Sequence, residues 1–267
     1  MVSGAVTQTC ASERSASTSP RQHVERDRSV FHYPPSESAV RVVARFRPLE
    51  RFEQLAQIKK GDAPFGISGQ SVSTENEHGQ SSSFLFDKVF SSLASQEQVY
   101  KLVAKPLVGD VLNGFNATIF AYGHTGSGKT HTMFGPPTET FLLADERGIS
   151  PRAIQQIFKH MRNASDVEYV LKCSVLEVYR ETLRDLINPT QRQLQIKENP
   201  DRGIYVDGLS EEGVCCEEDI MEIMAASNRA RAVAATHLNT CSSRSHVIFM
   251  LTCTQTRPDG RQTQSKL

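Results

Sequence analysis

The sequence predicts an α/β fold, with a central sheet covered by helices on both faces. Two observations predict it: apolar runs of strand length alternate with helix-periodic segments, and a glycine-rich turn joins one such strand to a following helix. The composition agrees, because 38% apolar and 22% charged residues over 267 positions are an ordinary globular mixture. No apolar run is long enough for a membrane span.

Charge and cysteine usage narrow the class of protein further. The 30 basic residues balance the 30 acidic ones, so no overall field favours nucleic acid. The first twenty residues lack the apolar core of a secretory signal. The cysteines show no zinc-ligand spacing, and Cys173 and Cys253 lie in apolar alternating runs. We therefore expect a soluble cytosolic protein in which these two thiols are buried and reduced.

The N-terminal segment differs from the rest of the chain in its amino-acid composition. Residues 1–36 are rich in Ser and Arg and end near Pro34-Pro35. Such a segment offers little apolar surface to offset the loss of chain entropy. It predicts a disordered extension over 1–36 and a folded domain over 37–267.

The elements of the first half follow from periodicity. Ala39–Ala44 reads as a mostly buried strand and Phe84–Phe86 as a short one, with a polar, glycine-rich stretch between them. Ser95–Gln98 has the form of a capping box, and apolar residues then recur at helical spacing over Val99–Leu112. Pro106 should kink or divide that helix.

The second half continues the alternation. Ala117–Tyr122 is an uninterrupted strand-like run of the kind buried on both faces. Ser150-Pro151 should begin a helix, with Ser150 as its N-cap. The further expected elements are a strand over Val167–Tyr179, a hairpin of Gln193–Glu198 with Gly203–Val206, a helix over Glu217–Ala235 and a strand over Val247–Thr256.

The glycine-rich turn carries the chemistry. Residues Gly123–Thr130 fit G-x-x-x-x-G-K-[ST], after a strand and before a candidate helix. Glycines let backbone N–H groups approach phosphate oxygens, Lys129 adds a full charge, and the Thr130 hydroxyl suits magnesium. A glycine-rich turn with an incidental lysine is the alternative, but every required position matches. The motif predicts nucleoside triphosphate binding.

A second polar cluster lies between a predicted helix and a predicted strand. Asn239–His246 reads N-T-C-S-S-R-S-H. It could be a loop whose hydroxyls cap the helix end, or it could line a phosphate and a metal. A Ser-His hydrolase is the least favoured alternative, because the G-x-S-x-G elbow is absent.

Together these motifs resemble the kinesin motor domain. Arg45-Phe-Arg47-Pro48 resembles the family's adenine-contacting segment, and Gly123–Thr130 followed by His131-Thr-Met resembles its P-loop. Asn239–His246 is similar to its switch I signature, N-x-x-S-S-R-S-H. The segments Val175–Tyr179 and Ile187-Asn-Pro also resemble kinesin sequences. The resemblance covers about 39–267 and is nearest to the conventional, N-terminal-motor type.

The resemblance implies the kinesin motor fold, a P-loop NTPase with a mixed parallel and antiparallel central sheet, and ATP with Mg²⁺ as cofactors. Arg45, Pro48 and His131 would enclose the adenine, and Thr130 with Ser243 would bind Mg²⁺. His124 stands where many family members carry Gln, at a position that contributes mainly backbone. The implied nucleotide-binding residues are Arg45, Pro48, Gly123, His124, Thr125, Gly126, Ser127, Gly128, Lys129, Thr130 and His131.

Switch I would supply the catalytic groups. By the resemblance, Ser242 contacts the γ-phosphate or the attacking water, while Arg231 and Asn239 help to sense the γ-phosphate. Arg244 would pair with a glutamate of switch II. The implied catalytic residues are Asn239, Ser242, Ser243 and Arg244.

The implied activity is ATP-driven movement along microtubules, in the cytoplasm and on the cytoskeleton. The hairpin carrying Lys197, Arg202 and Tyr205 resembles a secondary contact with tubulin, whose surface is acidic. An exposed Lys and Arg could equally belong to a solvated turn. Homodimerisation would need a C-terminal region outside these residues.

The sequence ends just before the place where the family's switch II, D-L-A-G-S-E, would follow. We expect residues 1–267 alone to be poorly stable and nearly inactive. The alternative is a non-motile nucleotide-binding or tubulin-interacting module, or a decayed kinesin fragment, and the transcript beyond Leu267 would decide. The final Ser265-Lys266-Leu267 matches a peroxisomal address, but it also equals family text before switch II.

Overall fold

The computed structural model describes residues 4–12, 40–49, 53, 66–75, 78–136, 144–189, 194–200, 203–237 and 245–267. The chain divides into two compact units. The first comprises Met1–Asp110 and Phe115–Ser150, and the second Val111–Gly114 and Pro151–Leu267. In the described part of the chain, no helix combines the length and the apolar character needed to cross a bilayer.

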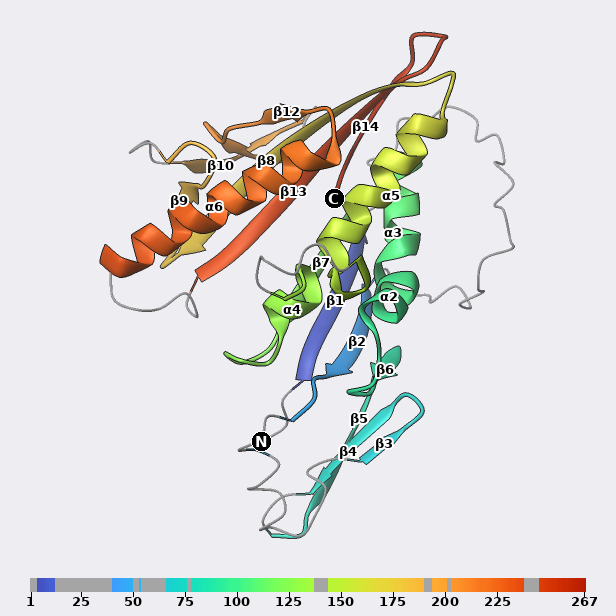
Figure 1. The fold of residues 1–267 in the computed structure, drawn as a ribbon, viewed down its shortest axis with the longest axis vertical. Helices are drawn as coiled ribbons and strands as arrows, with labels where there is room; N and C mark the ends of the chain where they lie inside the picture. The colour runs from blue at the N-terminus through green and yellow to red at the C-terminus, as the bar shows by residue number, and fades with distance from the viewer. Residues whose placement is uncertain are drawn as a thin grey trace. The chain divides into compact units, whose positions relative to one another are not determined.

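The main sheet of the first unit has the strand order β6-β2-β1-β7 (Figure 1). Its strands are β1 (Gly4–Ser12), β2 (Val40–Phe46), β6 (Lys88–Phe90) and β7 (Asn116–Tyr122). β2 is parallel to β6, while β1 runs antiparallel to both β2 and β7. The sheet is therefore mixed, as predicted, and β7 leads directly into the glycine-rich turn.

The prediction of disorder over 1–36 is wrong for Gly4–Ser12. These residues form β1, which pairs along its length with β2 on one edge and with β7 on the other. The prediction weighed only how much apolar side-chain surface the segment could bury. A strand inserted between two others also gains backbone hydrogen bonds along both edges. The remainder of 1–36 lies outside the described residues.

β7 corrects a second expectation. The apolar run predicted burial on both faces, but Phe120 is 42% exposed and Tyr122 is 71% exposed. Ala117 on the opposite face is buried. The strand therefore alternates between a covered and an open face in the described structure, because an apolar run in the sequence does not show what covers each side of it.

The helical segment beside this sheet is divided, as Pro106 predicted. The capping box is confirmed, because Ser95 and Gln98 exchange both of its hydrogen bonds at the start of α2 (Gln96–Val99). A π-helical turn (Tyr100–Ala104) follows, and α3 (Lys105–Leu112) then carries Pro106 in its first turn. A π-turn next to a proline is one of the usual ways in which a helix absorbs a break in its hydrogen-bond ladder.

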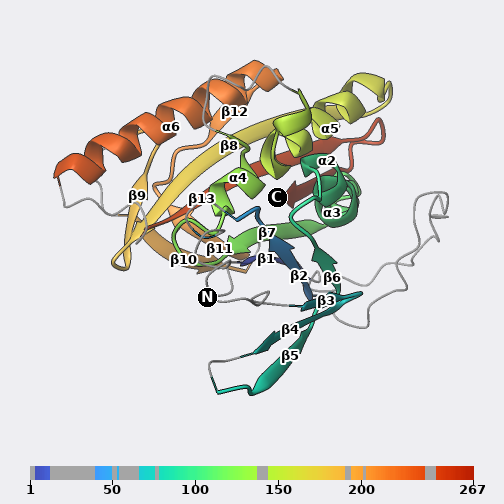
Figure 2. The ribbon, with the colours of Figure 1, turned by 60° about the horizontal axis from the view of Figure 1, so that its bottom comes forward.

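A small antiparallel sheet completes the first unit (Figure 2). Its strands are β3 (Gly66–Ser68), β4 (Ser71–Glu75) and β5 (Ser81–Leu85). The stretch predicted as polar and glycine-rich thus contains two strands, and the strand predicted at Phe84–Phe86 lies slightly earlier. Val72 of β4 is buried in one cluster with Ala44, Phe46 and Val89. This apolar cluster joins the small sheet to the main one.

The second unit is built on β8 and β13, which pair antiparallel along their whole lengths. The sheet order is β12-β8-β13-β14, and β9 also pairs with β8. Its strands are β8 (Glu168–Tyr179), β9 (Thr182–Asp185), β12 (Glu212–Val214), β13 (Ser245–Thr256) and β14 (Gln262–Lys266). The strands expected at Val167–Tyr179 and Val247–Thr256 are confirmed as β8 and β13.

The remaining elements match their predictions, apart from the cap of one helix. The expected hairpin is β10 (Gln195–Asn199) with β11 (Gly203–Asp207). The helix expected from Glu217 is α6 (Glu217–His237), which contacts β8 (Figures 1 and 2). α5 (Ile149–Asn163) begins one residue before Ser150, so Ser150 lies in the first turn and is not the N-cap.

The final three residues belong to the sheet of the second unit. Ser265 is fully buried in β14, and its hydroxyl donates to the Val111 carbonyl at 2.7 Å. Leu267 exchanges two backbone hydrogen bonds of 2.9 Å with Leu251. The Ser-Lys-Leu sequence therefore has a structural role in this unit.

Both thiols predicted to be buried are buried and free. Cys173 and Cys253 are at most 1% exposed. Burial raises the pKa of Cys173 to about 12 and that of Cys253 to about 11. At neutral pH both are thiols, the form that does not react as a nucleophile.

We expect iodoacetamide at pH 8 to alkylate exposed Cys215 in the folded chain and to spare Cys173 and Cys253. Folding raises the pKa of both buried thiols above the unfolded value of 9.0. The protonated thiols therefore make their full contribution to the free energy of unfolding below pH 9, and this contribution declines above pH 9. The decline is about 1.4 kcal/mol per pH unit for each thiol until the folded pKa is reached. Peptide mapping and urea unfolding between pH 8 and 11 measure the two effects. Alkylation of Cys173 as fast as Cys215 would contradict the prediction.

Candidate nucleotide-binding site

The glycine-rich turn lies in the setting that its motif predicted. β7 ends at Tyr122, and α4 (Lys129–Met133) begins at the lysine of the motif. Gly126 and Gly128 have φ of 80° and 94°, a left-handed conformation that side-chain-bearing residues rarely adopt. Gly128 is also the N-cap of α4. With only five residues, α4 adds little dipole, so anion binding here depends on backbone amides and on Lys129.

Lys129 folds back over the turn that precedes it. Its ammonium group donates to the carbonyls of Gly123 and His124, at 2.8 and 2.9 Å. The His124 carbonyl also accepts from the Ser127 amide at 3.1 Å. An ammonium has three N–H donors, so two carbonyl contacts leave one for another acceptor. The turn therefore holds the positive charge of Lys129 close to the Gly123 and His124 carbonyls.

The turn also contains an unsatisfied polar atom. The Ser127 hydroxyl is buried without a hydrogen-bond partner among the described residues. Buried hydroxyls are normally paired, so such an atom calls for an explanation. The amides of Lys129 and Thr130 open α4 and have no acceptor within the helix. A ligand rich in acceptors, such as a polyphosphate, matches this set of donors.

The fit to magnesium depends on Thr130. Thr130 is exposed at the start of α4. Its hydroxyl is a hard oxygen ligand of the kind that Mg²⁺ accepts. No group of three or more His, Cys, Asp or Glu in the described residues could hold a metal ion. Mg²⁺ needs no such cage beside a nucleotide, because it usually takes one or two protein oxygens together with phosphate oxygens and water.

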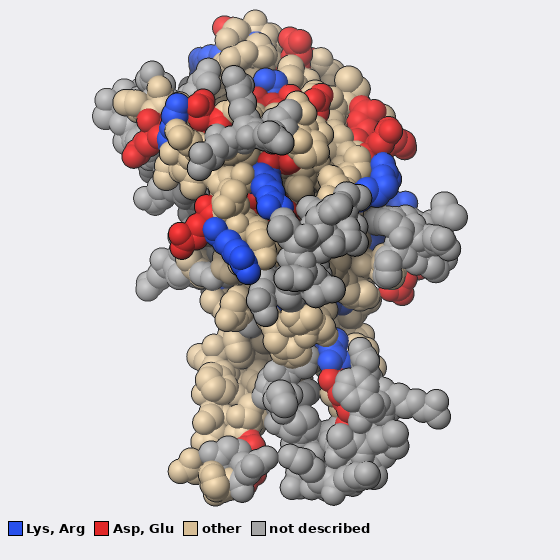
Figure 3. Space-filling view, turned by 90° about the vertical axis from the view of Figure 1, so that its left-hand side faces the viewer, with Lys and Arg blue, Asp and Glu red and all other residues tan. Residues whose placement is uncertain are grey.

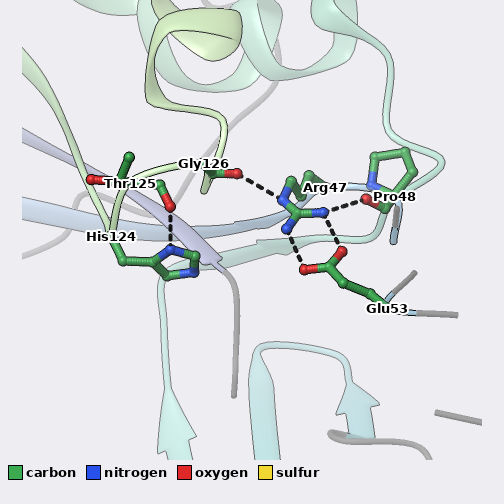
Figure 4. A network of polar contacts seen from close by, with 6 residues as sticks. All are labelled: Arg47, Pro48, Glu53, His124, Thr125 and Gly126. Carbon is green, nitrogen blue, oxygen red and sulfur yellow. Dashed lines mark hydrogen bonds and ion pairs between the residues drawn. The ribbon is translucent and has the colours of Figure 1, made fainter. Parts of the chain in front are cut away.

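Arg47 ties the end of β2 to the turn (Figure 4). Its Nε donates to the Gly126 carbonyl at 2.9 Å, and one terminal nitrogen donates to the Pro48 carbonyl. The two terminal nitrogens form a bidentate pair with the Glu53 carboxylate, at 2.6 and 2.7 Å. This fork holds the guanidinium rigidly. Pro48 is thereby held at an exposed position beside the turn.

Arg45, near the end of β2, is buried. Arg45 is 9% exposed. Its Nη1 atom donates both to Gln96 Oε1 at 2.9 Å and to Thr132 Oγ1 at 3.0 Å. Burial lowers the Arg45 pKa, and the nearby Glu146 charge partly offsets this. An arginine remains protonated in any case. Arg45 therefore supplies a buried positive charge and two fixed contacts.

His131 is joined to Arg45 through Gln96. The Gln96 amide nitrogen lies 3.1 Å from His131 Nδ1 and donates to the His131 carbonyl at 2.7 Å. His131 keeps an exposed surface, but packing around its ring lowers its pKa and the Arg45 charge lowers it further, against an opposing effect of Glu146. The imidazole is thus neutral at physiological pH. A neutral ring is suited to contact a flat organic group.

In the second unit, Arg231 is partly exposed and contacts Glu177 and Ser245. Its guanidinium lies 3.3 Å from a carboxylate oxygen of Glu177, which is buried in β8. It also donates to the Ser245 hydroxyl at 2.9 Å. Ser245 begins β13, directly after Arg244. The four switch I residues Asn239, Ser242, Ser243 and Arg244 lie outside the described residues, as does Arg202.

Sequence reasoning missed three residues that organise these contacts. Gln96 was read only as part of a capping box, and Arg47 only as part of a motif. Glu177 appeared only within a strand. A glutamate inside an apolar strand run was a usable signal, because a buried carboxylate requires a partner. For Gln96 the sequence held no such signal, since its hydrogen-bond partners lie 35 to 51 residues away along the chain.

Comparison with known proteins places the chain in a family. A sequence model of the kinesin motor domain matches residues 45–267. The kinesin heavy chain of Neurospora crassa is 41% identical over 222 residues, covering 82% of this chain and 23% of that protein. Kinesin-like protein KIF3C of Bos taurus is 39% identical over 233 residues, covering 84% and 28%. The chain thus spans 23–28% of the length of these relatives.

A solved structure gives the same answer for the fold. It is described as "Structure of a fast kinesin: Implications for ATPase mechanism and interactions with microtubules" and is 39% identical, with a TM-score of 0.75. The alignment covers 84% of this chain and 62% of that one. The chain belongs to the kinesin motor-domain family and has the P-loop NTPase fold of that family.

Proposed function

We propose that this chain binds Mg-ATP at the Gly123–Thr130 turn and couples its hydrolysis to movement along microtubules. The observation that carries the proposal is the set of donors at one turn. Lys129 brings a positive charge with a remaining N–H, Ser127 a buried hydroxyl without a partner, and α4 its first amides. ATP offers the matching acceptors on adjacent phosphates.

Each residue of the turn has a separate task in this proposal. The amides of 125–130 hold the phosphate oxygens, while Lys129 neutralises charge on the β- and γ-phosphates. Thr130 and Ser243 hold Mg²⁺. Held there, Mg²⁺ would supply positive charge to offset the negative charge of the phosphates. The left-handed glycines keep side chains out of the space that the phosphates occupy.

We propose that the base lies against Pro48 and His131, with Arg45 behind them. Pro48 is exposed at the end of the Arg47 network, and His131 is neutral with an exposed surface. A pyrrolidine and a neutral imidazole both offer surfaces on which a base can stack. Arg45 contributes through Gln96 and Thr132, because its own guanidinium is buried.

For hydrolysis we propose that Ser242 contacts the attacking water or the γ-phosphate and that Asn239 and Arg231 respond to it, with Arg244 closing the site. The contacts of Arg231 support an anchoring role as well. Through Glu177 and Ser245 it fixes the residue that follows Arg244.

For the microtubule we propose a secondary contact at the β10–β11 hairpin. Lys197 forms an ion pair of 2.7 Å with Asp207, and both side chains are about half exposed. On the other face of this hairpin, Ile196 and Ile204 are 65% and 70% exposed. The face drawn in Figure 3 shows Lys and Arg interspersed with Asp and Glu. A local contact by Lys197 and Arg202 therefore suits tubulin better than a broad electrostatic attraction.

Nucleotide binding and hydrolysis are expected to separate in residues 1–267. We expect calorimetry to show binding of ATP that weakens when EDTA removes Mg²⁺. Residues 1–267 contain no D-L-A-G-S-E motif, and loss of one preorganised transition-state donor typically costs about 10²–10³ in rate. We therefore expect turnover with microtubules at least about 100-fold below that of a chain supplied with a kinesin switch II region. Absence of ATP binding would contradict the proposal.

A further inference from the structure

Gln96 has a buried side chain that joins three elements near the P-loop. It is the first residue of α2 and is 4% exposed. The capping box of this helix uses Ser95 and Gln98, so the Gln96 amide takes no part in it. Its contacts instead reach Arg45 in β2, His131 in α4 and the Glu146 carbonyl. A buried amide with this many partners is fixed in position.

The orientation of this amide follows from its partners. A guanidinium has donors and no acceptor, so the group that meets Arg45 at 2.9 Å must be the carbonyl oxygen Oε1. The NH₂ group is then directed to His131. There it donates to the backbone carbonyl at 2.7 Å, which only an N–H donor can do. Both ends of the amide are assigned by independent contacts.

The orientation of Gln96 in turn determines the hydrogen-bonding state of His131. The amide nitrogen lies 3.1 Å from Nδ1, and because it is a donor, Nδ1 must accept. A neutral imidazole that accepts at Nδ1 carries its proton on Nε2. No described residue is recorded as a partner of Nε2. His131 therefore has a fixed ring and one free N–H donor.

We propose that Gln96 is a positioning residue for the nucleotide base, holding His131 so that its Nε2–H meets a ring-nitrogen or carbonyl acceptor of the base. This inference rests on the proposed ATP-binding function and assigns to it a residue outside the recognised motifs. Gln96 acts only through Arg45 and His131. It has no contact with the phosphate-binding turn among its recorded hydrogen bonds.

Two probes separate the base from the phosphates in the test. Mg-ATP reports on both, whereas Mg-tripolyphosphate has no base and reports only on the turn. The variant is Gln96→Met, which keeps the length of the side chain and removes its hydrogen bonds. Gln98→Met is the matched control, because it makes the same change two residues along α2 and breaks only the exposed capping bond. Affinities are measured by calorimetry with the full chain.

We expect Gln96→Met to bind Mg-ATP about tenfold more weakly, because the buried hydrogen bond to Arg45 and the partly buried ones to His131 are lost. Its affinity for Mg-tripolyphosphate should stay within about twofold of the parent chain, and Gln98→Met should change neither. Equal losses for both ligands would show a merely structural role and overturn the inference, as would unchanged binding of ATP. If the parent chain binds neither ligand, the proposed function itself fails.

Discussion

Replacing Lys129 with Ala will weaken Mg-ATP binding by at least about 100-fold. The lysine is expected to make charge-assisted contacts with two phosphate groups, each worth about 1.5–3 kcal/mol. Two such contacts correspond to a factor of roughly 10²–10⁴ in affinity. Among the described residues of the Gly123–Thr130 turn, Lys129 is the one side chain with a formal positive charge. No neighbour in the turn can therefore take over its role. Calorimetry with Mg-ATP measures the loss.

The structure indicates a second effect of the same variant. Lys129 also binds the carbonyls of Gly123 and His124, so its removal loosens the turn itself. Lys129→Met, which keeps most of the side-chain volume, controls for packing. Lys101→Ala is the matched control for charge, because Lys101 is exposed and pairs with Glu97 on the helix surface. Nucleotide affinity retained in Lys129→Ala would remove the basis of the proposed site.

The local part of the site could be predicted from the sequence, because its geometry is local. Left-handed backbone at Gly126 and Gly128, a lysine directly after the last glycine, and a strand before the turn are all encoded within about a dozen residues. Glycine at such φ values is a property of the single residue. The motif therefore predicted both the turn and its neighbours, β7 and α4.

The contacts behind the turn could not be predicted, because they join residues far apart in the chain. Arg45 meets Gln96 and Thr132 across 51 and 87 positions. Arg45 was expected to help enclose the adenine, and the sequence did not show that Arg45 is 9% exposed and that its guanidinium is in contact with Gln96 and Thr132. A sequence motif reports which residue types are needed without reporting the depth at which each one lies. Gln96 lies between Ser95 and Gln98, whose capping-box pattern predicted the start of the helix. That pattern gave no indication of the contacts that Gln96 itself makes.

β1 and β7 illustrate a different limit. Residues 4–12 were judged by composition, yet a strand is stabilised by whichever backbone lies beside it. For β7, the apolar run indicated a strand correctly, while the exposure of Phe120 and Tyr122 depends on what packs over that face. Pairing and covering are properties of the assembled sheet, and local periodicity carries little information about them.

Replacing Arg231 with Met will destabilise the chain by about 3 kcal/mol. Its partner Glu177 is 5% exposed, and removing one member of a buried pair leaves an uncompensated charge that typically costs 3–5 kcal/mol. Arg231 is partly exposed, so the lower end of that range is expected. Against a total of about 5–15 kcal/mol for a typical domain, this is a large fraction. The midpoint of urea unfolding measures it.

Two further variants test whether the buried charge is the cause. Lys172→Met, on the same strand as Glu177, breaks an ion pair with Glu211 in which both side chains are about half exposed. An exposed pair of this kind should cost less than about 1 kcal/mol. The double variant Glu177→Met with Arg231→Met removes both charges and should recover most of the loss. Equal effects of Arg231→Met and Lys172→Met would contradict the argument.

The double variant also tests the role proposed for Arg231 at the γ-phosphate. An anchor acts by fixing Ser245 at the start of β13, whereas a γ-phosphate sensor acts on the nucleotide. If Arg231 is a sensor, the double variant will regain stability but will lose the difference in affinity between ATP and ADP, because ADP lacks the γ-phosphate. If the difference returns together with stability, although the bond from Arg231 to Ser245 is still missing, Arg231 is not a γ-phosphate sensor and its main contribution is to neutralise Glu177. Affinities for both nucleotides, measured beside the unfolding midpoint, distinguish these results.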